Sequence, residues 1–148
     1  MAQILLIEDQ PSSLMSLIAD LEREGYEVIR AYSYNSAIGL WREYNGYFDC
    51  IVLDLNIDPD GLNADQIDEY SPVHGILVLD KICKGKMQGK SKDPQKIWDK
   101  TIIHSGYTKE LKKFTKYESL KKIPKGGTSI SEVFAKVKEI IINNVDNG

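Results

Sequence analysis

The chain of 148 residues contains only two cysteines, Cys50 and Cys83, which lie far apart and show no Cys-x-x-Cys spacing. This scarcity indicates neither a disulfide framework nor a zinc site, so both cysteines are interpreted as reduced, small apolar residues. No apolar run approaches the roughly 20 residues that a membrane-spanning helix needs, and no basic segment precedes the first apolar run. We therefore expect a cytoplasmic protein that makes no contact with a membrane.

Glycine is missing from the turn at residues 8–11, where nucleotide-binding folds have the glycines that let the backbone approach phosphates. This absence disfavours a nucleotide-binding protein or an unrelated hydrolase. The two histidines, His74 and His104, have no partner at a metal-ligand spacing, so we interpret both as structural. The stretch that starts at Asn56 begins like a calcium loop, but Ile67 stands where such a loop needs a bidentate glutamate.

The composition, with 42% apolar and 28% charged residues, is that of one globular domain, which we expect to span residues 1–148. The net charge of −3 conceals an uneven distribution. Residues 1–70 carry 14 Asp/Glu and 3 Lys/Arg, whereas residues 71–148 carry 8 and 16. No basic motif interleaved with aromatic residues accompanies the lysines, so solvated helices explain them better than nucleic-acid binding does.

The first part of the chain alternates between the patterns of strands and helices. Apolar runs at 3–7, 26–32 and 49–56 predict strands, and the centre of the third, Cys50 to Leu53, suits a strand buried on both faces. Between them, apolar residues at helical spacing follow Ser12 or Ser13 and later Ser33, which we expect to cap two helices. Alternating units of this kind predict a parallel sheet with helices on both faces.

The second part is less regular, and its elements are predicted from shorter patterns. In order, we expect an acidic loop over 58–72, a mostly buried helix over 73–84, an exposed lysine-rich loop over 85–96, a strand over 100–104, a helix capped by Thr108 that carries Leu111, Phe114 and Tyr117, a weak strand over 119–123, and a final helix that begins with the capping box Ser129 and Glu132.

Acidic residues follow two of the predicted strands directly, Glu8 and Asp9 after the first and Asp54 after the third. Open parallel sheets place their ligands at the carboxyl ends of the strands, so these three carboxylates are expected to converge there. Like charges at such short range repel strongly, which requires a cation nearby. A divalent metal ion with oxygen ligands and a lysine side chain both meet this requirement.

Taken singly, each of these residues also has a purely structural explanation. Asp54 could begin a turn, and Glu8 with Asp9 could cap the first helix. Ser105 stands before Gly106 and could be a turn residue, and Lys125 could be one more surface lysine. Their joint order and spacing after successive strands is what favours a functional site.

The set of Glu8, Asp9, Asp54, Ser105 and Lys125 resembles that of the receiver domains of two-component response regulators, in their single-domain form. This resemblance covers nearly the whole chain. It implies a flavodoxin-like, doubly wound α/β fold with five parallel strands in the order 2-1-3-4-5. It also implies insertions at about 58–72 and 85–99, because this chain has about twenty more residues between Asp54 and Ser105 than the family usually shows.

The resemblance further implies a role for each residue in a Mg²⁺-dependent phosphorelay. Asp54 would accept a phosphoryl group from a sensor histidine kinase or a histidine phosphotransfer protein. Asp9, Glu8 through a water, Asp54 and the backbone carbonyl of Asn56 would hold Mg²⁺, while Ser105 and Lys125 would bind the phosphoryl oxygens. A protein of this kind switches a downstream partner, unknown for this chain, and is not an enzyme that turns over a separate substrate.

Two positions depart from the family pattern. Gly126 follows Lys125 where the family normally has proline, and Lys122 stands where the family commonly has an aromatic residue that turns inward on phosphorylation. Tyr107 and Tyr117 are the other aromatic candidates for such a switch. The two insertions and the missing aromatic residue also support an alternative, an interaction module that works without phosphorylation and docks its partner on the inserted loops.

Overall fold

The predicted strands all form, and they join into one sheet in a computed structural model of the chain, which describes residues 1–84, 87 and 93–147. The sheet is parallel throughout and has the strand order β2-β1-β3-β4-β5, which confirms the predicted fold class. Its strands are β1 (Gln3–Ile7), β2 (Glu27–Ala31), β3 (Cys50–Leu53), β4 (Thr101–Ser105) and β5 (Lys121–Pro124).

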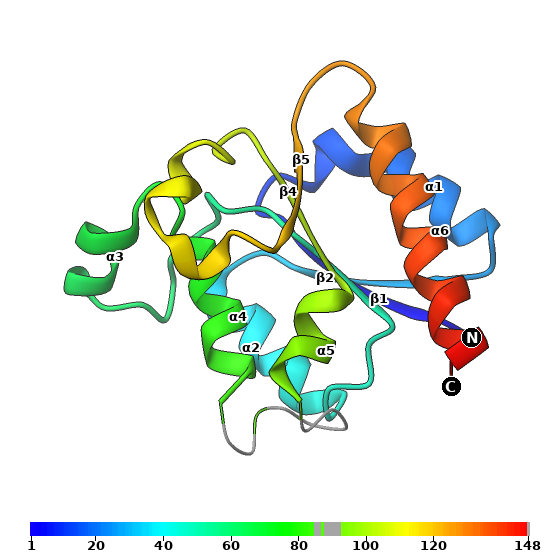
Figure 1. Cartoon of the computed structure of the whole chain (residues 1–148), viewed down its shortest axis with the longest axis horizontal. Coiled ribbons are helices and arrows are strands. Elements are labelled where there is room, and N and C mark those ends of the chain that lie inside the picture. The colour runs from blue at the N-terminus through cyan, green and yellow to red at the C-terminus, as the bar shows by residue number, and fades with distance from the viewer. Residues whose placement is uncertain (85–86, 88–92, 148) are drawn as a thin grey trace.

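Helices cover both faces of this sheet (Figure 1). In chain order the helices among the described residues are η1 (Pro11–Leu14), α1 (Met15–Arg23), α2 (Tyr34–Glu43), α3 (Ala64–Tyr70), η2 (His74–Ile76), α4 (Leu77–Ile82), α5 (Pro94–Asp99), η4 (Glu110–Lys113), η5 (Thr115–Tyr117) and α6 (Ser129–Asn147), where η denotes a 3-10 helix. None of the helices in the described part of the chain has the length and apolar character required to cross a bilayer.

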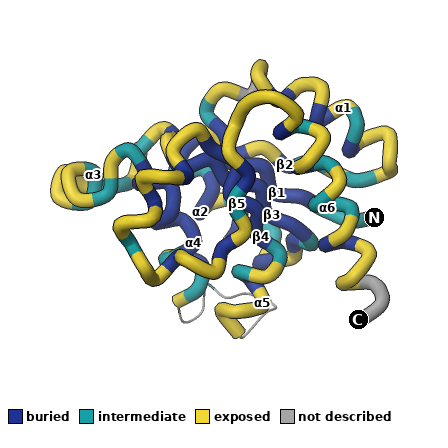
Figure 2. Tube along the Cα trace, turned by 45° about the horizontal axis from the view of Figure 1, so that its top comes forward, coloured by how far each residue is buried: buried dark blue, intermediate teal, exposed yellow. Residues whose placement is uncertain are grey.

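The two faces of the sheet bury separate apolar cores, because successive side chains of a strand point to opposite faces. On one face, Leu6 of β1 and Val52 of β3 pack with residues of α1 and α6. On the other face, Leu5 and Leu53 pack with residues of α2, α4 and α5. Figure 2 shows the strands as a buried centre, and the exposed residues lie in the helices and loops around it. Because helices pack against both faces of the sheet, the carboxyl ends of its strands are held in place along one edge.

The start of the first helix differs from the prediction. Pro11–Leu14 forms the 3-10 turn η1, and neither serine caps α1, which has Leu14 at its N-cap position. Ser13 instead donates its hydroxyl to the carbonyl of Gln10 (3.0 Å). The second helix starts as predicted, because the Ser33 hydroxyl accepts the N–H of Ser36 (3.0 Å).

The predicted acidic loop over 58–72 is wrong in part, because it contains helix α3. Asn63 and Gln66 form a capping box there: each side chain accepts the other residue's backbone N–H, at 2.8 and 3.0 Å. None of the residues of α3 is buried. A helix without a buried stripe leaves no apolar periodicity in the sequence, so only its cap could have revealed it.

The segment from 73 to 96 follows the prediction only partly. The predicted helix over 73–84 is present as η2 followed by α4. Residues 85–86 and 88–92 of the predicted lysine-rich loop lie outside the described residues. The end of that loop is wrong, because Asp93 accepts the N–H of Gln95 (3.0 Å) and starts α5.

Between β4 and β5 the predicted α-helix is replaced by the two 3-10 turns η4 and η5, and Thr108 caps neither of them. Leu111, Phe114 and Tyr117 are spaced three apart, which is the period of a 3-10 helix and not the 3.6 of an α-helix. The last helix begins at the predicted residue, Ser129. The predicted capping box is wrong, because the Glu132 N–H donates to the Thr128 carbonyl (3.1 Å) and not to the Ser129 hydroxyl. The Ser129 hydroxyl is instead bonded to the Gly126 N–H (3.2 Å).

Candidate functional site

The predicted acids and the predicted lysine meet at the carboxyl edge of the sheet. Backbone hydrogen bonds continue the strand ladders past the strand ends: Glu8 N–H to Ala31 O (2.9 Å), Asp54 N–H to Ile7 O (3.0 Å) and Lys125 N–H to Ser105 O (3.1 Å). These bonds hold the three side chains at one place. The Lys125 ammonium donates to Glu8 Oε1 at 2.6 Å and to Asp54 Oδ2 at 2.9 Å.

Three carboxylates form a compact oxygen cluster beside this lysine. One oxygen each of Glu8, Asp9 and Asp54 lies within 4.8 Å of the others. The second oxygen of Glu8, Oε2, is buried and has no hydrogen-bond partner among the described residues. A buried acceptor without a partner is costly, and hard oxygen ligands at this spacing suit Mg²⁺. The donor set therefore fits the ion implied by the resemblance.

The pKa values of these groups report the same crowding. Burial and the neighbouring Asp54 together raise the pKa of Glu8 to about 7. Burial and the charge of Asp54 also raise the pKa of Asp9. Asp54 itself is buried, but Glu8, Ser105 and Lys125 outweigh the burial and lower its pKa. Asp54 is therefore the carboxylate that stays ionised most readily, as a nucleophile must.

The remaining predicted site residues lie around Asp54. Its Oδ1 atom accepts the backbone N–H of Leu55 (2.7 Å) and, more weakly, that of Asn56 (3.4 Å), which places the Asn56 backbone beside the carboxylate. Ser105 is the last residue of β4 and is fully buried, and its hydroxyl accepts the N–H of Tyr107 (3.2 Å). The structure thus brings Asn56 and Ser105 to the same edge as the acids.

Gly75 lies against this site, and the sequence pattern did not mark it as part of one. Its N–H donates to Leu55 O (2.7 Å), so η2 touches the chain directly after β3. A Cβ atom at Gly75 would lie 2.5 Å from the Asp54 carbonyl oxygen and 2.7 Å from that of Leu55. Only glycine fits here without displacing the Asp54 backbone. A glycine early in a predicted buried helix was the one available signal.

Both histidines are buried and hydrogen-bonded inside the fold. His74 Nε2 contacts the Ile57 carbonyl (2.5 Å), and His104 Nε2 contacts Ser129 Oγ (3.1 Å). Burial, together with the charge of Lys125, lowers the pKa of His104 to about 4. Both residues thus contact protein groups, in agreement with a structural role.

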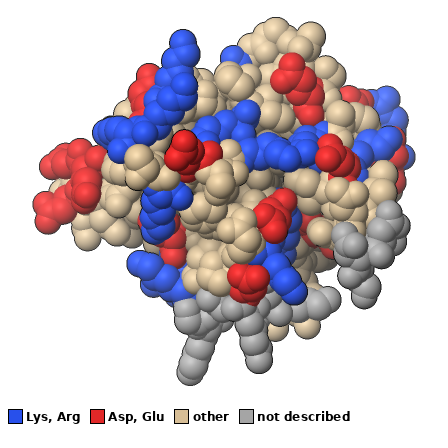
Figure 3. Space-filling view, in the orientation of Figure 1, with Lys and Arg blue, Asp and Glu red and all other residues tan. Residues whose placement is uncertain are grey.

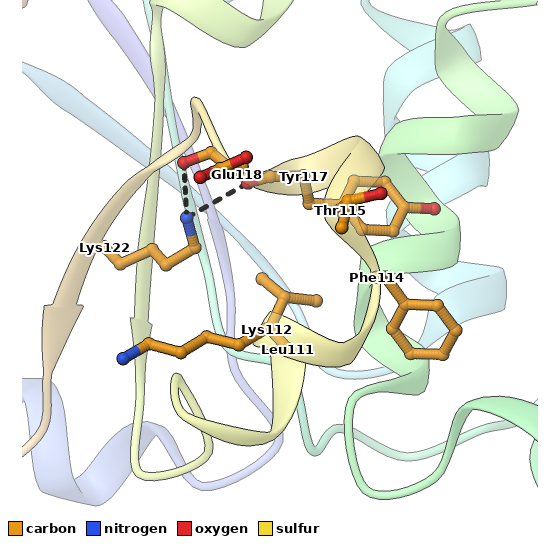
Figure 4. A pocket seen from close by; sticks show the side chains of 7 residues that line it. All are labelled: Leu111, Lys112, Phe114, Thr115, Tyr117, Glu118 and Lys122. Atoms are coloured by element: carbon orange, nitrogen blue, oxygen red, sulfur yellow. Dashed lines mark hydrogen bonds between the residues drawn. The ribbon is translucent and has the colours of Figure 1, made fainter.

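Lys122, where the resemblance led us to expect an aromatic residue, is held by hydrogen bonds to backbone carbonyls. Its ammonium donates to the carbonyl oxygens of Tyr117 and Glu118, each at 3.0 Å (Figure 4). It also donates to the Leu120 carbonyl at 3.0 Å. It borders a cavity of about 300 Å³ whose wall also includes Leu111. Tyr117 is itself buried, and its hydroxyl donates to Asp80 (2.6 Å).

No protein-family model matches the chain, and no curated protein matches it in sequence. Solved structures do match. A response regulator receiver domain protein from Clostridium thermocellum has 19% identity and a TM-score of 0.67, with 100% of both chains covered. A CheY-like receiver domain protein from Methanospirillum hungatei has 23% identity and a TM-score of 0.66, with 100% of this chain and 99% of that chain covered.

A third match is the response regulator TrrA from Thermotoga maritima, which was solved in complex with Mg²⁺-BeF. It has 21% identity and a TM-score of 0.59, and the match covers 95% of this chain and 99% of that one. These matches agree in fold with the parallel sheet of order β2-β1-β3-β4-β5. The chain has, over nearly its full length, the fold of the receiver domains of response regulators.

Proposed function

We propose that this protein is a response regulator receiver that accepts a phosphoryl group on Asp54 in a Mg²⁺-dependent reaction. The observation that carries the proposal is the Lys125 ammonium, which lies within hydrogen-bond distance of both Glu8 and Asp54. Residues that are 117 and 71 positions apart in the chain meet there with the acid cluster. A structural turn or a helix cap needs no such convergence.

The residues of the site divide the work of phosphoryl transfer among them. An ionised oxygen of Asp54 attacks phosphorus; the new O–P bond forms as the bond from phosphorus to the donor breaks, and that electron pair leaves with the donor. The Lys125 ammonium and the Ser105 hydroxyl would bind the phosphoryl oxygens. Positioning and charge stabilisation of this kind are most of what phosphoryl transfer requires.

Glu8, Asp9, Asp54 and the carbonyl of Asn56 would hold the metal ion. Mg²⁺ bound there would neutralise charge on the carboxylates and on the phosphoryl oxygens. The unpartnered Glu8 Oε2 is the atom that supports this assignment. Lys125 supplies part of the positive charge without the ion, because it already contacts two of the acids.

The proposal also covers the partners of the protein. A sensor histidine kinase or a histidine phosphotransfer protein would supply the phosphoryl group, which places the reaction in the cytoplasm. A downstream protein would then recognise the phosphorylated state. The chain would act as a phosphoacceptor that assists its own phosphorylation and dephosphorylation, and not as an enzyme with a separate substrate.

Intact-mass measurement after incubation with acetyl phosphate and Mg²⁺ tests the proposal. We expect one phosphoryl group on the wild-type protein and none on Asp54→Asn. Asp60→Asn is the matched control, because Asp60 is an exposed acid near the same strand end, and it should be labelled like the wild type. A wild-type protein that takes up no phosphoryl group, and that binds no beryllofluoride in its place, would contradict the proposal.

The interaction module without phosphorylation is the second candidate, and the fixed position of Lys122 favours it. An ammonium tied to three carbonyls cannot swing inward as an aromatic switch does. A module of this kind has no need for the metal ion. A Mg²⁺ titration that leaves the fluorescence of Trp41 and Trp98 unchanged, together with absent labelling, would favour this reading.

A further inference from the structure

The residues that follow Lys125 do little by themselves to restrict the conformation of its turn. Gly126 and Gly127 follow the lysine with φ angles of +125° and +51°, values that favour glycine. A Cβ atom added to either would meet nothing within 4 Å, so the surrounding structure does not confine them. Glycine loses more conformational freedom on folding than any other residue. The position of the lysine must therefore be set by hydrogen bonds to its neighbours.

Ser129 supplies those bonds from the start of α6. Its hydroxyl oxygen accepts the Gly126 N–H at 3.2 Å, and its own N–H donates to the Gly126 carbonyl at 3.0 Å. Ser129 thus holds both polar groups of the residue after Lys125. The bond from Lys125 N–H to Ser105 O (3.1 Å) fixes the other side of the lysine. Ser129 is itself only 5% exposed.

His104 anchors Ser129 to the sheet. It lies in β4, opposite Ile123 of β5, and its Nε2 atom is 3.1 Å from the Ser129 hydroxyl oxygen. The ring is 2% exposed, and burial together with the charge of Lys125 lowers its pKa to about 4. The imidazole is therefore neutral at neutral pH and adds no second positive charge beside the lysine. The hydrogen-bonded series His104, Ser129 and Gly126 therefore connects strand β4 to the turn that follows Lys125.

We propose that Ser129, anchored by His104, is the positioning residue that holds the Lys125 ammonium against Glu8 and Asp54. Ser129 would thereby restrict the backbone after Lys125, as a proline ring would do at position 126, where this chain has glycine. The effect on phosphorylation rests on the proposed function of Asp54. The effect on the lysine itself does not, so the two can be tested apart.

The first test observes the lysine directly by NMR in the protein without phosphodonor. A lysine NH₃⁺ signal is sharp only when hydrogen bonds protect its protons from exchange with water. We expect a protected signal that Lys125→Met removes and thereby assigns. Ser129→Ala should broaden or remove this signal, whereas Ser129→Thr, which keeps a hydroxyl, should retain it. Ser131→Ala is the matched control, because the Ser131 hydroxyl donates to the Thr128 carbonyl (2.8 Å), outside the turn at Gly126.

The second test is a double-variant cycle on the rate of labelling by acetyl phosphate. Ser129→Ala should lower the rate about tenfold, since small displacements of a positioning group have effects of this order or larger. In the Lys125→Met background the same change should have no further effect. If Ser129 had only a structural role, Ser129→Ala would lower the labelling rate by the same factor in the wild-type and Lys125→Met proteins.

The outcomes separate this proposal from the function on which it rests. An unlabelled wild type with a Lys125 signal that still depends on Ser129 would overturn the function and support the positioning role. If Ser129→Ala does not fold, His104→Leu replaces it with the same expected results. A folded variant of either kind with an unchanged Lys125 signal would overturn the positioning role.

Discussion

His104 is a buried base inside the central sheet, and its protonation couples the stability of the fold to pH. Burial lowers its pKa to about 4 in the folded protein, against 6.5 for an ordinary histidine side chain. The unfolded chain therefore binds this proton first as the pH falls. The stability that the neutral ring contributes is complete above about pH 6.5 and is lost as the pH drops toward 4. The loss amounts to roughly 3 kcal/mol at about 1.4 kcal/mol per pKa unit.

Urea unfolding at pH 7.0 and pH 4.5 measures this contribution. His104→Leu removes the titrating group, so it should lose roughly 2–3 kcal/mol less stability between the two pH values than the wild type does. The comparison cancels the other groups that titrate in this range, Glu8 among them. Equal losses in the two proteins would show that His104 is not held neutral by the fold.

Sequence patterns predicted the site residues whose role follows from their position directly after a strand. Glu8, Asp9, Asp54 and Lys125 each stand at a strand end, and parallel strands bring their ends to one edge. Ser129 and His104 could not be found in this way. They are 25 positions apart, and a hydrogen bond between two side chains leaves no periodic trace in a sequence.

At the scale of elements, the approach of η2 to the end of β3 depends on a missing side chain. Gly75→Ala would place a methyl group 2.5 Å from the Asp54 carbonyl oxygen, which forces the backbone apart. We expect a loss of about 1–3 kcal/mol in the free energy of unfolding, the usual cost of overpacking. Circular dichroism during urea unfolding measures it.

Gly39 is the matched control for this substitution. It lies inside α2, is exposed, and a Cβ atom there would meet nothing within 4 Å. Gly39→Ala should therefore stabilise the protein by about 0.5–1 kcal/mol, because alanine is the better helix residue. Two glycines in helical segments thus have opposite expected effects. A Gly75→Ala protein as stable as the wild type would mean that η2 does not pack this closely.

The elements that sequence reasoning missed have a common physical cause. Patterns of burial predict the strands and the amphipathic helices, because those residues face a core. Helix α3 has no buried residue, and η4 and η5 follow a period of three, so the 3.6-residue pattern fits none of them. All three lie outside the ladder of the sheet. Their boundaries are set by caps and by tertiary contacts such as those of Lys122.

Across the whole molecule, the uneven charge of the sequence becomes an uneven surface. Figure 3 shows acidic side chains gathered at the end of the molecule where α3 lies, and a band of basic side chains across the same face. The acids of α3 are exposed to solvent, whereas Glu8 and Asp54 are buried at the end of the sheet. Bulk salt screens the exposed charges, but it reaches the buried ones much less.

Because salt screens the acids at the end of the sheet less than the exposed ones, Mg²⁺ that binds them should stabilise the fold beyond the effect of ionic strength. An ion that binds only the folded protein stabilises it by RT ln(1 + [Mg²⁺]/Kd), which is about 1.4 kcal/mol at ten times the dissociation constant. For a domain of this size that corresponds to a rise of about 3–5 °C in Tm. Thermal unfolding in MgCl₂, compared with KCl at equal ionic strength, measures this rise in Tm.

Asp9→Asn removes one of the three clustered carboxylates and should abolish most of the rise in Tm, whereas Asp60→Asn should leave it intact. Because mass action requires a site that exists in the folded state, an equal rise in MgCl₂ and KCl would place the effect on the exposed surface charges and not on the buried acids.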